Sequence, residues 1–190
     1  MKKVALAVAA MALALVGTAK AAMFDYAKLY GGVTIEPQLS WDDGLGALNY
    51  DMDSGFNVGG ALGWNVSHDL SVEVDGMYTH SQYSCCTSTL ETFSIMVDAI
   101  YHIDIGSKWT PYVGVGIGGV NNTYYNTSGT GGASDFVFGA QGMAGMTIPI
   151  SQDLDLGLEY RYQWSDDASD SGITWEYKSH NIDLGLTFHL

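Results

Sequence analysis

The chain has 190 residues, a formal net charge of −14 at neutral pH, 24 glycines, 12 tyrosines and three prolines. So acidic a chain is poorly suited to binding nucleic acid, and it has no direct attraction for anionic lipid headgroups. Many glycines and aromatic residues, without helical periodicity after the first 21 residues, favour a closed all-β structure.

The first 21 residues have the layout of a secretory signal peptide. Lys2-Lys3 gives a charged start, residues 4–16 form a nearly uninterrupted apolar run, and Ala19-Lys20-Ala21 has the small-x-small pattern of a cleavage site. The apolar run is shorter than the ~20 residues that span a membrane, so it is less suited to being an uncleaved anchor. We expect a signal peptide at 1–21 and one exported domain at 22–190.

Eight segments alternate apolar residues with polar or small ones, as β-strands with two different faces do. In chain order they are residues 28–41, 55–65, 70–79, 91–103, 109–120, 135–148, 154–164 and 180–190. The last two are the clearest; in the last, every second residue from Ile182 to Leu190 is large and apolar. Each segment is close to the ~10 residues that a tilted transmembrane strand needs.

The connections between these strands alternate in length. Short turns at 66–69, 104–108 and 149–153 alternate with long loops at 42–54, 80–90, 121–134 and 165–178. A barrel with both termini in the periplasm has short turns at one rim and long loops at the other. The pattern predicts an eight-stranded antiparallel up-and-down transmembrane β-barrel. The alternative, a soluble lipocalin-type barrel, fits less well because the more polar face is rich in glycine.

The loop at 80–90 carries two adjacent cysteines, Cys85 and Cys86. In an oxidising compartment they could form a strained disulfide, pair between molecules or be capped by a small thiol. The simplest interpretation is a local staple of this loop.

The strand register places one acid-rich face inside the barrel. Arg161 is the only strong base predicted to point inward from mid-strand, and its guanidinium group can hold two carboxylates at once. We expect a structural ion-pair network that fills the lumen; the alternative is a path for protons or small cations. The other ionisable residues predicted to point inward are Glu36, Glu73, Asp75, Asp98, His102, Asp155, Glu159, Asp183 and His189.

Three segments carry a family resemblance: PYVGVGIGG at 111–119, AGMTIPISQDLDLGLEYRY at 144–162 and LGLTFHL at 184–190. Together they resemble the small outer-membrane β-barrel superfamily of OmpA-like and opacity-type domains, with kinship to rickettsial surface antigens. The resemblance covers all of 22–190. It implies insertion by the barrel assembly machinery, which reads the C-terminal strand. The family usually ends on an aromatic residue, whereas this chain has Leu190 there.

The sequence contains no convincing pattern of catalytic or metal-binding residues. Some eight-stranded barrels modify lipid A with a His and a Ser near one rim, and the nearest candidates are His80-Ser81 and Ser179-His180, both without a supporting acid. The acidic stretches at 51–55 and 166–172 lack the bidentate Glu of a calcium loop. We expect no enzyme, no catalytic residues, no cofactor and no metal site.

These observations predict a protein of the outer membrane of a Gram-negative bacterium, with a structural, adhesive or other surface role. Its partners would be outer-membrane lipid and lipopolysaccharide, the barrel assembly machinery, and a host or surface ligand that contacts loops 42–54, 80–90, 121–134 and 165–178. The alternatives are a narrow porin-like channel for small solutes or ions and, less favoured, a lipid A-modifying enzyme.

Overall fold

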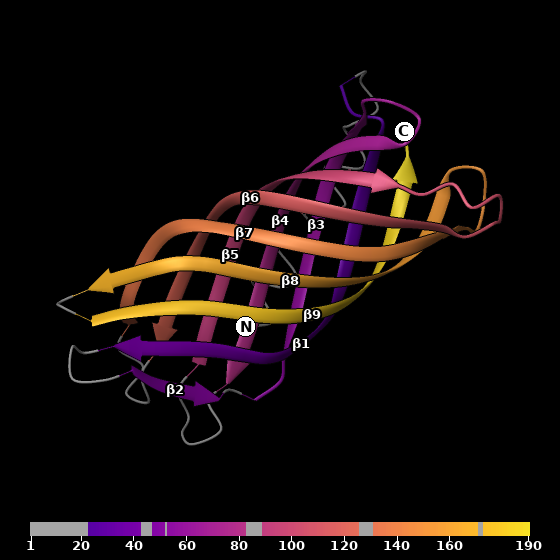
Figure 1. Ribbon diagram of the computed structural model, residues 1–190. Helices are drawn as coiled ribbons and strands as arrows, with labels where there is room; N and C mark the ends of the chain where they lie inside the picture. Colours follow the sequence, from indigo (N-terminus) through magenta and orange to yellow (C-terminus); the bar gives the residue numbers. More distant parts are fainter. Residues whose placement is uncertain (1–22, 43–46, 52, 83–88, 126–130, 171–172) are drawn as a thin grey trace.

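The computed structural model describes residues 23–42, 47–51, 53–82, 89–125, 131–170 and 173–190, and all regular structure in them is β-strand (Figure 1). The described residues contain no helix that is long and apolar enough to cross a membrane. The strands are β1 (Tyr26–Asp42), β2 (Ala47–Asp51), β3 (Gly55–Asn65), β4 (Leu70–Gln82), β5 (Thr89–His102), β6 (Thr110–Tyr125), β7 (Gly131–Pro149), β8 (Leu154–Asp170) and β9 (Ile173–His189).

Eight of these strands close into an antiparallel barrel, which confirms the predicted fold class. Each strand from β3 to β9 pairs with the next in the chain, and β1 pairs with both β3 and β9. The seam between β1 and β9 runs from Tyr26 opposite His189 to Asp42 opposite Thr174, with a register shift between Ile35 and Gln38. Pro37 lies in that shift, where its missing N–H leaves no ladder bond unmade.

β2 is an addition that the sequence did not predict. It lies within the predicted loop 42–54 and pairs with β1 between Gln38 and Asp42, above the stretch of β1 that pairs with β3. The closed barrel therefore has eight strands, and β2 adds a short strand beside β1 at the long-loop rim (Figure 1).

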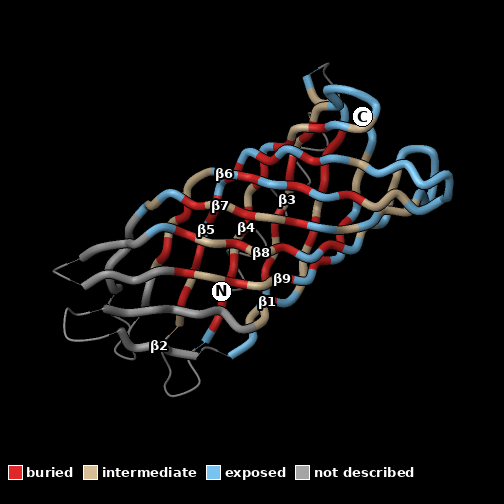
Figure 2. Tube along the Cα trace, in the orientation of Figure 1, coloured by how far each residue is buried: buried red, intermediate tan, exposed pale blue. Residues whose placement is uncertain are grey.

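The two faces of the barrel are inverted relative to a soluble protein. Buried and exposed residues alternate along the strands, and the buried ones are more often polar or charged than apolar (Figure 2). Large apolar side chains point outward instead, including Val115, Ile117 and Leu184, each of which is at least 60% exposed. An apolar exterior around a polar interior is what a barrel in lipid requires.

Inward glycines make room for large inward side chains on the neighbouring strand. A Cβ atom on Gly59, Gly63 or Gly145 would collide with the ring of Tyr30, Tyr26 or Tyr112, respectively. A Cβ atom on Gly116 would collide with the carboxylate of Asp98. The lumen of an eight-stranded barrel is only wide enough for side chains to fill it, and here they fill it by this interdigitation.

The predicted long loops are largely strand, which is a correction. β8 and β9 occupy all of 165–178 except residues 171–172, β4 and β5 take both ends of 80–90, and β6 and β7 take most of 121–134. Backbone pairing continues there although apolar alternation has ceased, because side chains beyond the lipid need no apolar outer face. The short turns near 66–69, 103–109 and 150–153 are as predicted.

Both ends of the described chain lie at the short-turn rim. The backbone N–H of Leu190 donates to the carbonyl of Asp25, and that of His189 donates to the carbonyl of Asp153. Trp109 and Tyr101 are about half exposed at this rim, as expected of aromatic residues at a membrane interface.

Closure of the barrel makes Gly32 intolerant of a side chain. A Cβ atom there would collide with the carbonyl oxygen of Ile182 and with the Cα of Asp183 across the seam, whereas one on Gly142 would meet no atom within 4 Å. We expect Gly32→Ala to lower the free energy of unfolding by about 1–3 kcal/mol, as overpacking does. Urea unfolding in detergent micelles measures this. Gly142→Ala is the matched control and should unfold like the parent; equal stability of the two variants would contradict the described seam.

Candidate functional site

Arg161 lies at the centre of the lumen with no exposed surface. Its Nη1 donates to Asp75 Oδ1 at 2.7 Å, and its Nη2 and Nε donate to Glu159 Oε1 at 2.8 and 3.1 Å. Asp75 is on β4 and Glu159 is two residues before Arg161 on β8, so the guanidinium group joins opposite parts of the barrel wall. The prediction that Arg161 holds two carboxylates is confirmed.

Tyr30 of β1 completes this contact. Its hydroxyl donates to Asp75 Oδ2 at 2.6 Å and accepts from Arg161 Nη1 at 3.0 Å. The Arg161 guanidinium carbon also lies 4.7 Å from the centre of the Tyr30 ring, within the range of a cation–π contact. Nη1 also lies 3.5 Å from Gln141 Oε1 on β7, so residues of four strands, β1, β4, β7 and β8, contact the guanidinium group.

A second buried cation, Lys28 of β1, joins the network, and the sequence reading missed it. Its Nζ lies 2.7 Å from Glu159 Oε2, the oxygen that also accepts the Tyr112 hydroxyl at 2.7 Å. Glu159 thus receives charge-assisted hydrogen bonds on both oxygens, which makes it the anionic centre between Lys28 and Arg161. The sequence did contain a signal for it. Lys28 lies an even number of positions before Tyr30 and Thr34, so the alternation of the strand places all three on the inward face.

Carboxylates outnumber these two cations. Glu73, Asp98 and Asp183 are also buried, and each has at least one carboxylate oxygen without a hydrogen-bond partner among the described residues. Tyr26 donates to Glu73 Oε1 at 2.9 Å, and Gln141 donates to Asp98 Oδ1 at 2.7 Å. The predicted inward placement of all three acids is confirmed, and the described lumen holds an excess of acids over bases.

Toward the long-loop end the lumen is lined by neutral polar groups. Asn181 Oδ1 accepts from Thr34 at 2.7 Å and from Asn57 at 3.2 Å, and Thr92 donates to Asn122 Oδ1 at 2.9 Å. All five residues are at least 97% buried. The lumen is therefore layered, with amides and hydroxyls above the ion pairs.

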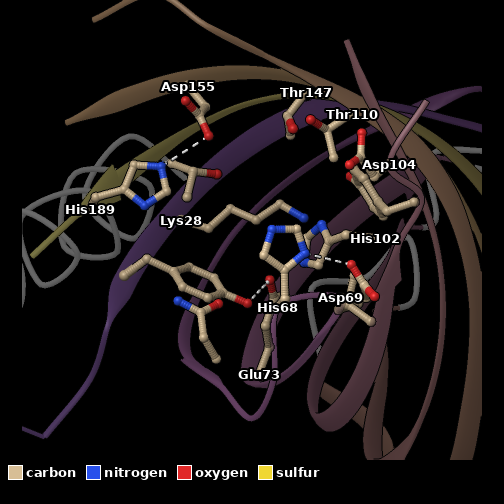
Figure 3. A pocket seen from close by; sticks show the side chains of 15 residues that line it. Lys28, His68, Asp69, Glu73, His102, Asp104, Thr110, Thr147, Asp155 and His189 are labelled. Atoms are coloured by element: carbon tan, nitrogen blue, oxygen red, sulfur yellow. Dashed lines mark hydrogen bonds and ion pairs between the residues drawn. The ribbon is translucent and has the colours of Figure 1, made fainter. Parts of the chain in front are cut away.

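A cavity of about 420 Å³ opens at the short-turn rim (Figure 3). Buried residues line its inner end, among them Lys28, Glu73 and Tyr112, so the ion network forms its floor. The mouth carries exposed polar residues, including Asp104 and His68. The pKa of His68 is raised because its imidazole is bonded to the Asp69 carboxylate. The described residues contain no group of three or more His, Cys, Asp or Glu that could hold a metal ion.

Two predicted inward histidines also line this cavity. His102 Nε2 lies 2.9 Å from Ser71 Oγ, and His189 Nε2 lies 3.0 Å from Asp155 Oδ2. Ser71 has no exposed surface, so its hydroxyl is closed to a substrate from outside. The Ser71–His102 contact joins β4 to β5, and sequence spacing alone did not reveal it.

The two Ser-His pairs considered from the sequence do not form hydroxyl–imidazole sites in the structure. Ser179 points into the lumen with no exposed surface, whereas its neighbour His180 contacts Tyr160 at 2.7 Å on the outer face. His80 and Ser81 are both buried near the end of β4, and His80 Nδ1 lies 3.7 Å from Glu91 Oε1. Adjacent residues of a strand point to opposite faces, so neither pair converges.

Some predicted residues lie outside what the structure describes. The side chain of Glu36 falls in an undescribed part of β1, and Cys85 and Cys86 lie in the undescribed segment 83–88. The tips of the predicted loops, at 43–46, 83–88, 126–130 and 171–172, are outside the described residues too.

A closed eight-stranded barrel with a lipid-type exterior and a filled polar lumen defines a small outer-membrane β-barrel protein. Residues 5–189 match the outer membrane protein beta-barrel domain family, and the chain belongs to that family. The outer membrane is therefore its location.

Similar proteins agree with this class. The chain is 31% identical over 137 residues to an outer membrane protein of Gluconacetobacter diazotrophicus, a match that covers 59% of this chain and 36% of that relative. The chain thus spans about a third of the relative's length.

Solved structures extend the comparison to the fold. Neisserial surface protein A matches with a TM-score of 0.63 at 20% identity, covering 87% of this chain and 96% of its own. OprG of Pseudomonas aeruginosa matches with a TM-score of 0.55 at 12% identity, covering 88% and 97%. The outer membrane protease OmpT of Escherichia coli matches at 0.51 and 8%, covering 91% and 100%. At these identities the likeness is one of fold alone.

Removing the guanidinium group should destabilise the barrel strongly. Arg161→Ala leaves Asp75 and part of Glu159 buried without a cation, a change that typically costs about 3–5 kcal/mol. We expect the variant to lose its heat-resistant, fast-migrating form on a gel at a clearly lower temperature than the parent. Lys108→Ala, at an exposed turn position, removes the same charge and is the control. An unchanged transition in Arg161→Ala would show that the network does not stabilise the fold.

Proposed function

We propose that this protein is a membrane-spanning scaffold with a closed lumen, which presents its long-loop rim at the cell surface for structural or adhesive contacts. The observation that carries the proposal is the position of Arg161. It has no exposed surface and binds carboxylates on two sides of a narrow lumen, so the middle of the barrel is blocked by side chains held in ion pairs.

The surface role is supported by the architecture of the long-loop rim. β1, β2, β8 and β9 extend beyond the stretch of apolar alternation at this end, so backbone-paired hairpins would project from the membrane. A ligand would contact the regions 42–54, 80–90, 121–134 and 165–178, where the described parts are backbone-paired strands. Lipopolysaccharide around the rim and the barrel assembly machinery during insertion are the other partners that we propose.

Cleavage of the segment 1–21 on export belongs to the same proposal. It would place the described strands from Tyr26 onward directly after a short mature N-terminus, at the short-turn rim.

A narrow cation channel is the second candidate, and the acid excess of the lumen favours it. Asp98 and Asp183 lie inside the barrel without a cation partner among the described residues, and carboxylates along a pore select for cations. For conduction, the contacts of Arg161 with Asp75 and Glu159 would have to open.

The closed scaffold and the channel differ in conductance. For the scaffold we expect no discrete current steps from the refolded wild-type chain in a planar lipid bilayer at neutral pH. Arg161→Ala should conduct if it remains folded, because the side chain that blocks the lumen is shortened while the acids remain. Regular cation-selective steps from the wild type would overturn the closed scaffold and establish the channel.

The orientation of the barrel can be tested with epitope tags. A tag inserted between Ser171 and Gly172 interrupts the β8–β9 hairpin, and one after Gln152 interrupts the short turn before β8. We expect antibody to label intact cells only when the tag is at 171–172. Both tags should be labelled in permeabilised cells, which controls for expression. Labelling of the tag at Gln152 on intact cells would reverse the proposed orientation.

A further inference from the structure

The cavity at the short-turn rim is a space that a closed scaffold does not need. Its volume of about 420 Å³ falls within the range of small-molecule sites, and it runs from exposed rim residues to a buried floor (Figure 3). Closure of the lumen depends on the contacts of Arg161, which is not among the residues that line the cavity.

The floor of the cavity contains a carboxylate with one oxygen that accepts no hydrogen bond from the described residues. Glu73 is 96% buried, lines the cavity and accepts the Tyr26 hydroxyl on Oε1, while its Oε2 has no partner in the described part of the chain. An anionic oxygen that is out of water and has no donor is costly unless a ligand, a proton or a cation meets it. Lys28, the base in the floor, directs its ammonium group to Glu159.

The rest of the lining is suited to an organic cation. The rings of Tyr26 and Tyr112 and the side chain of Ile100 give the inner part an apolar and aromatic wall on which an alkyl stem can pack. The Tyr112 ring already has Lys28 Nζ over it, 5.5 Å from the ring centre. Asp69, Asp104 and Asp155 add negative charge farther out. Asp69 and Asp155 contact histidines, whereas Asp104 has no ion pair within the described ranges and binds the backbone N–H of Gly106.

We propose that this cavity binds a small organic diamine. One ammonium group lies at the inner end of the cavity and pairs with the Glu73 carboxylate, the alkyl stem lies against Tyr26, Tyr112 and Ile100, and the second ammonium group meets the rim carboxylates around Asp104. A dicarboxylate or phosphate is disfavoured by the surrounding acids. A transition metal is disfavoured because no cluster of ligands for it exists among the described residues.

Isothermal titration calorimetry of the refolded full chain in zwitterionic detergent micelles tests this, with 1,4-diaminobutane as the probe. We expect saturable binding with one site, and no binding of butane-1,4-diol, which has the same stem without charge. Glu73→Gln keeps the size of the side chain but removes its charge, and should weaken binding about tenfold or more. Asp104→Asn, at the exposed rim, should weaken binding severalfold without risk to the fold.

Asp183→Asn is the matched control, because Asp183 is a buried lumen acid with unpartnered oxygens that does not line the cavity. It should bind the diamine like the parent. Absence of binding to the wild type, binding of the diol with similar affinity, or equal weakening in Asp183→Asn and Glu73→Gln would each overturn the proposal. If Glu73→Gln does not fold, unchanged affinity in Asp104→Asn overturns it instead.

Discussion

The structure depends on one constraint: within lipid, every backbone N–H and carbonyl group must find its partner inside the sheet. Pairing of β1 with β9 meets that demand by removing both edges of the sheet. Once eight strands close, the lumen is narrow, and its contents follow. Several large inward side chains lie where the neighbouring strand offers a glycine, as Gly59 does for Tyr30 and Gly145 does for Tyr112. The abundance of glycine thus reflects the width of the barrel.

The narrow lumen also governs where charges can lie. Arg161 and Lys28 are tolerated because Asp75 and Glu159 meet them at hydrogen-bond distance, and Tyr30 and Tyr112 use remaining acceptor positions of those acids. A buried ion pair is weak evidence for net stability, since desolvation offsets much of its attraction. Its effect here is to fix geometry, because it joins β1, β4 and β8 across the lumen.

Much of this could be predicted from the sequence, because a strand in a barrel has a period of two and an environment that differs sharply between its faces. That period sufficed to place Glu73, Asp98, Asp183 and Arg161 inside. It could not identify the partner of Arg161 on β4, since Asp75 is 86 residues away and the stagger between strands decides which inward residues share a level. Lys28 was missed because a residue at the start of a strand gives little alternation to read. Strand ends were set too short for a related reason: beyond the lipid, pairing persists without the apolar signal.

The layering of the lumen has a consequence for what can approach from each side. From the long-loop end, a solute meets neutral groups such as Asn57, Asn122 and Asn181, which bind one another or nearby hydroxyls and leave single polar atoms such as Asn57 Oδ1 without a partner in the described residues. From the short-turn end it meets the open cavity and, at its floor, Glu73 with an unused oxygen. Five buried carboxyl groups accompany two buried cations in the described lumen, and an interior of that kind reaches neutrality by taking up protons or external cations. Among the described residues, the cavity through which the latter could approach opens at the short-turn rim, so the described parts of the two ends differ chemically even though the wall is built from one repeated strand pattern.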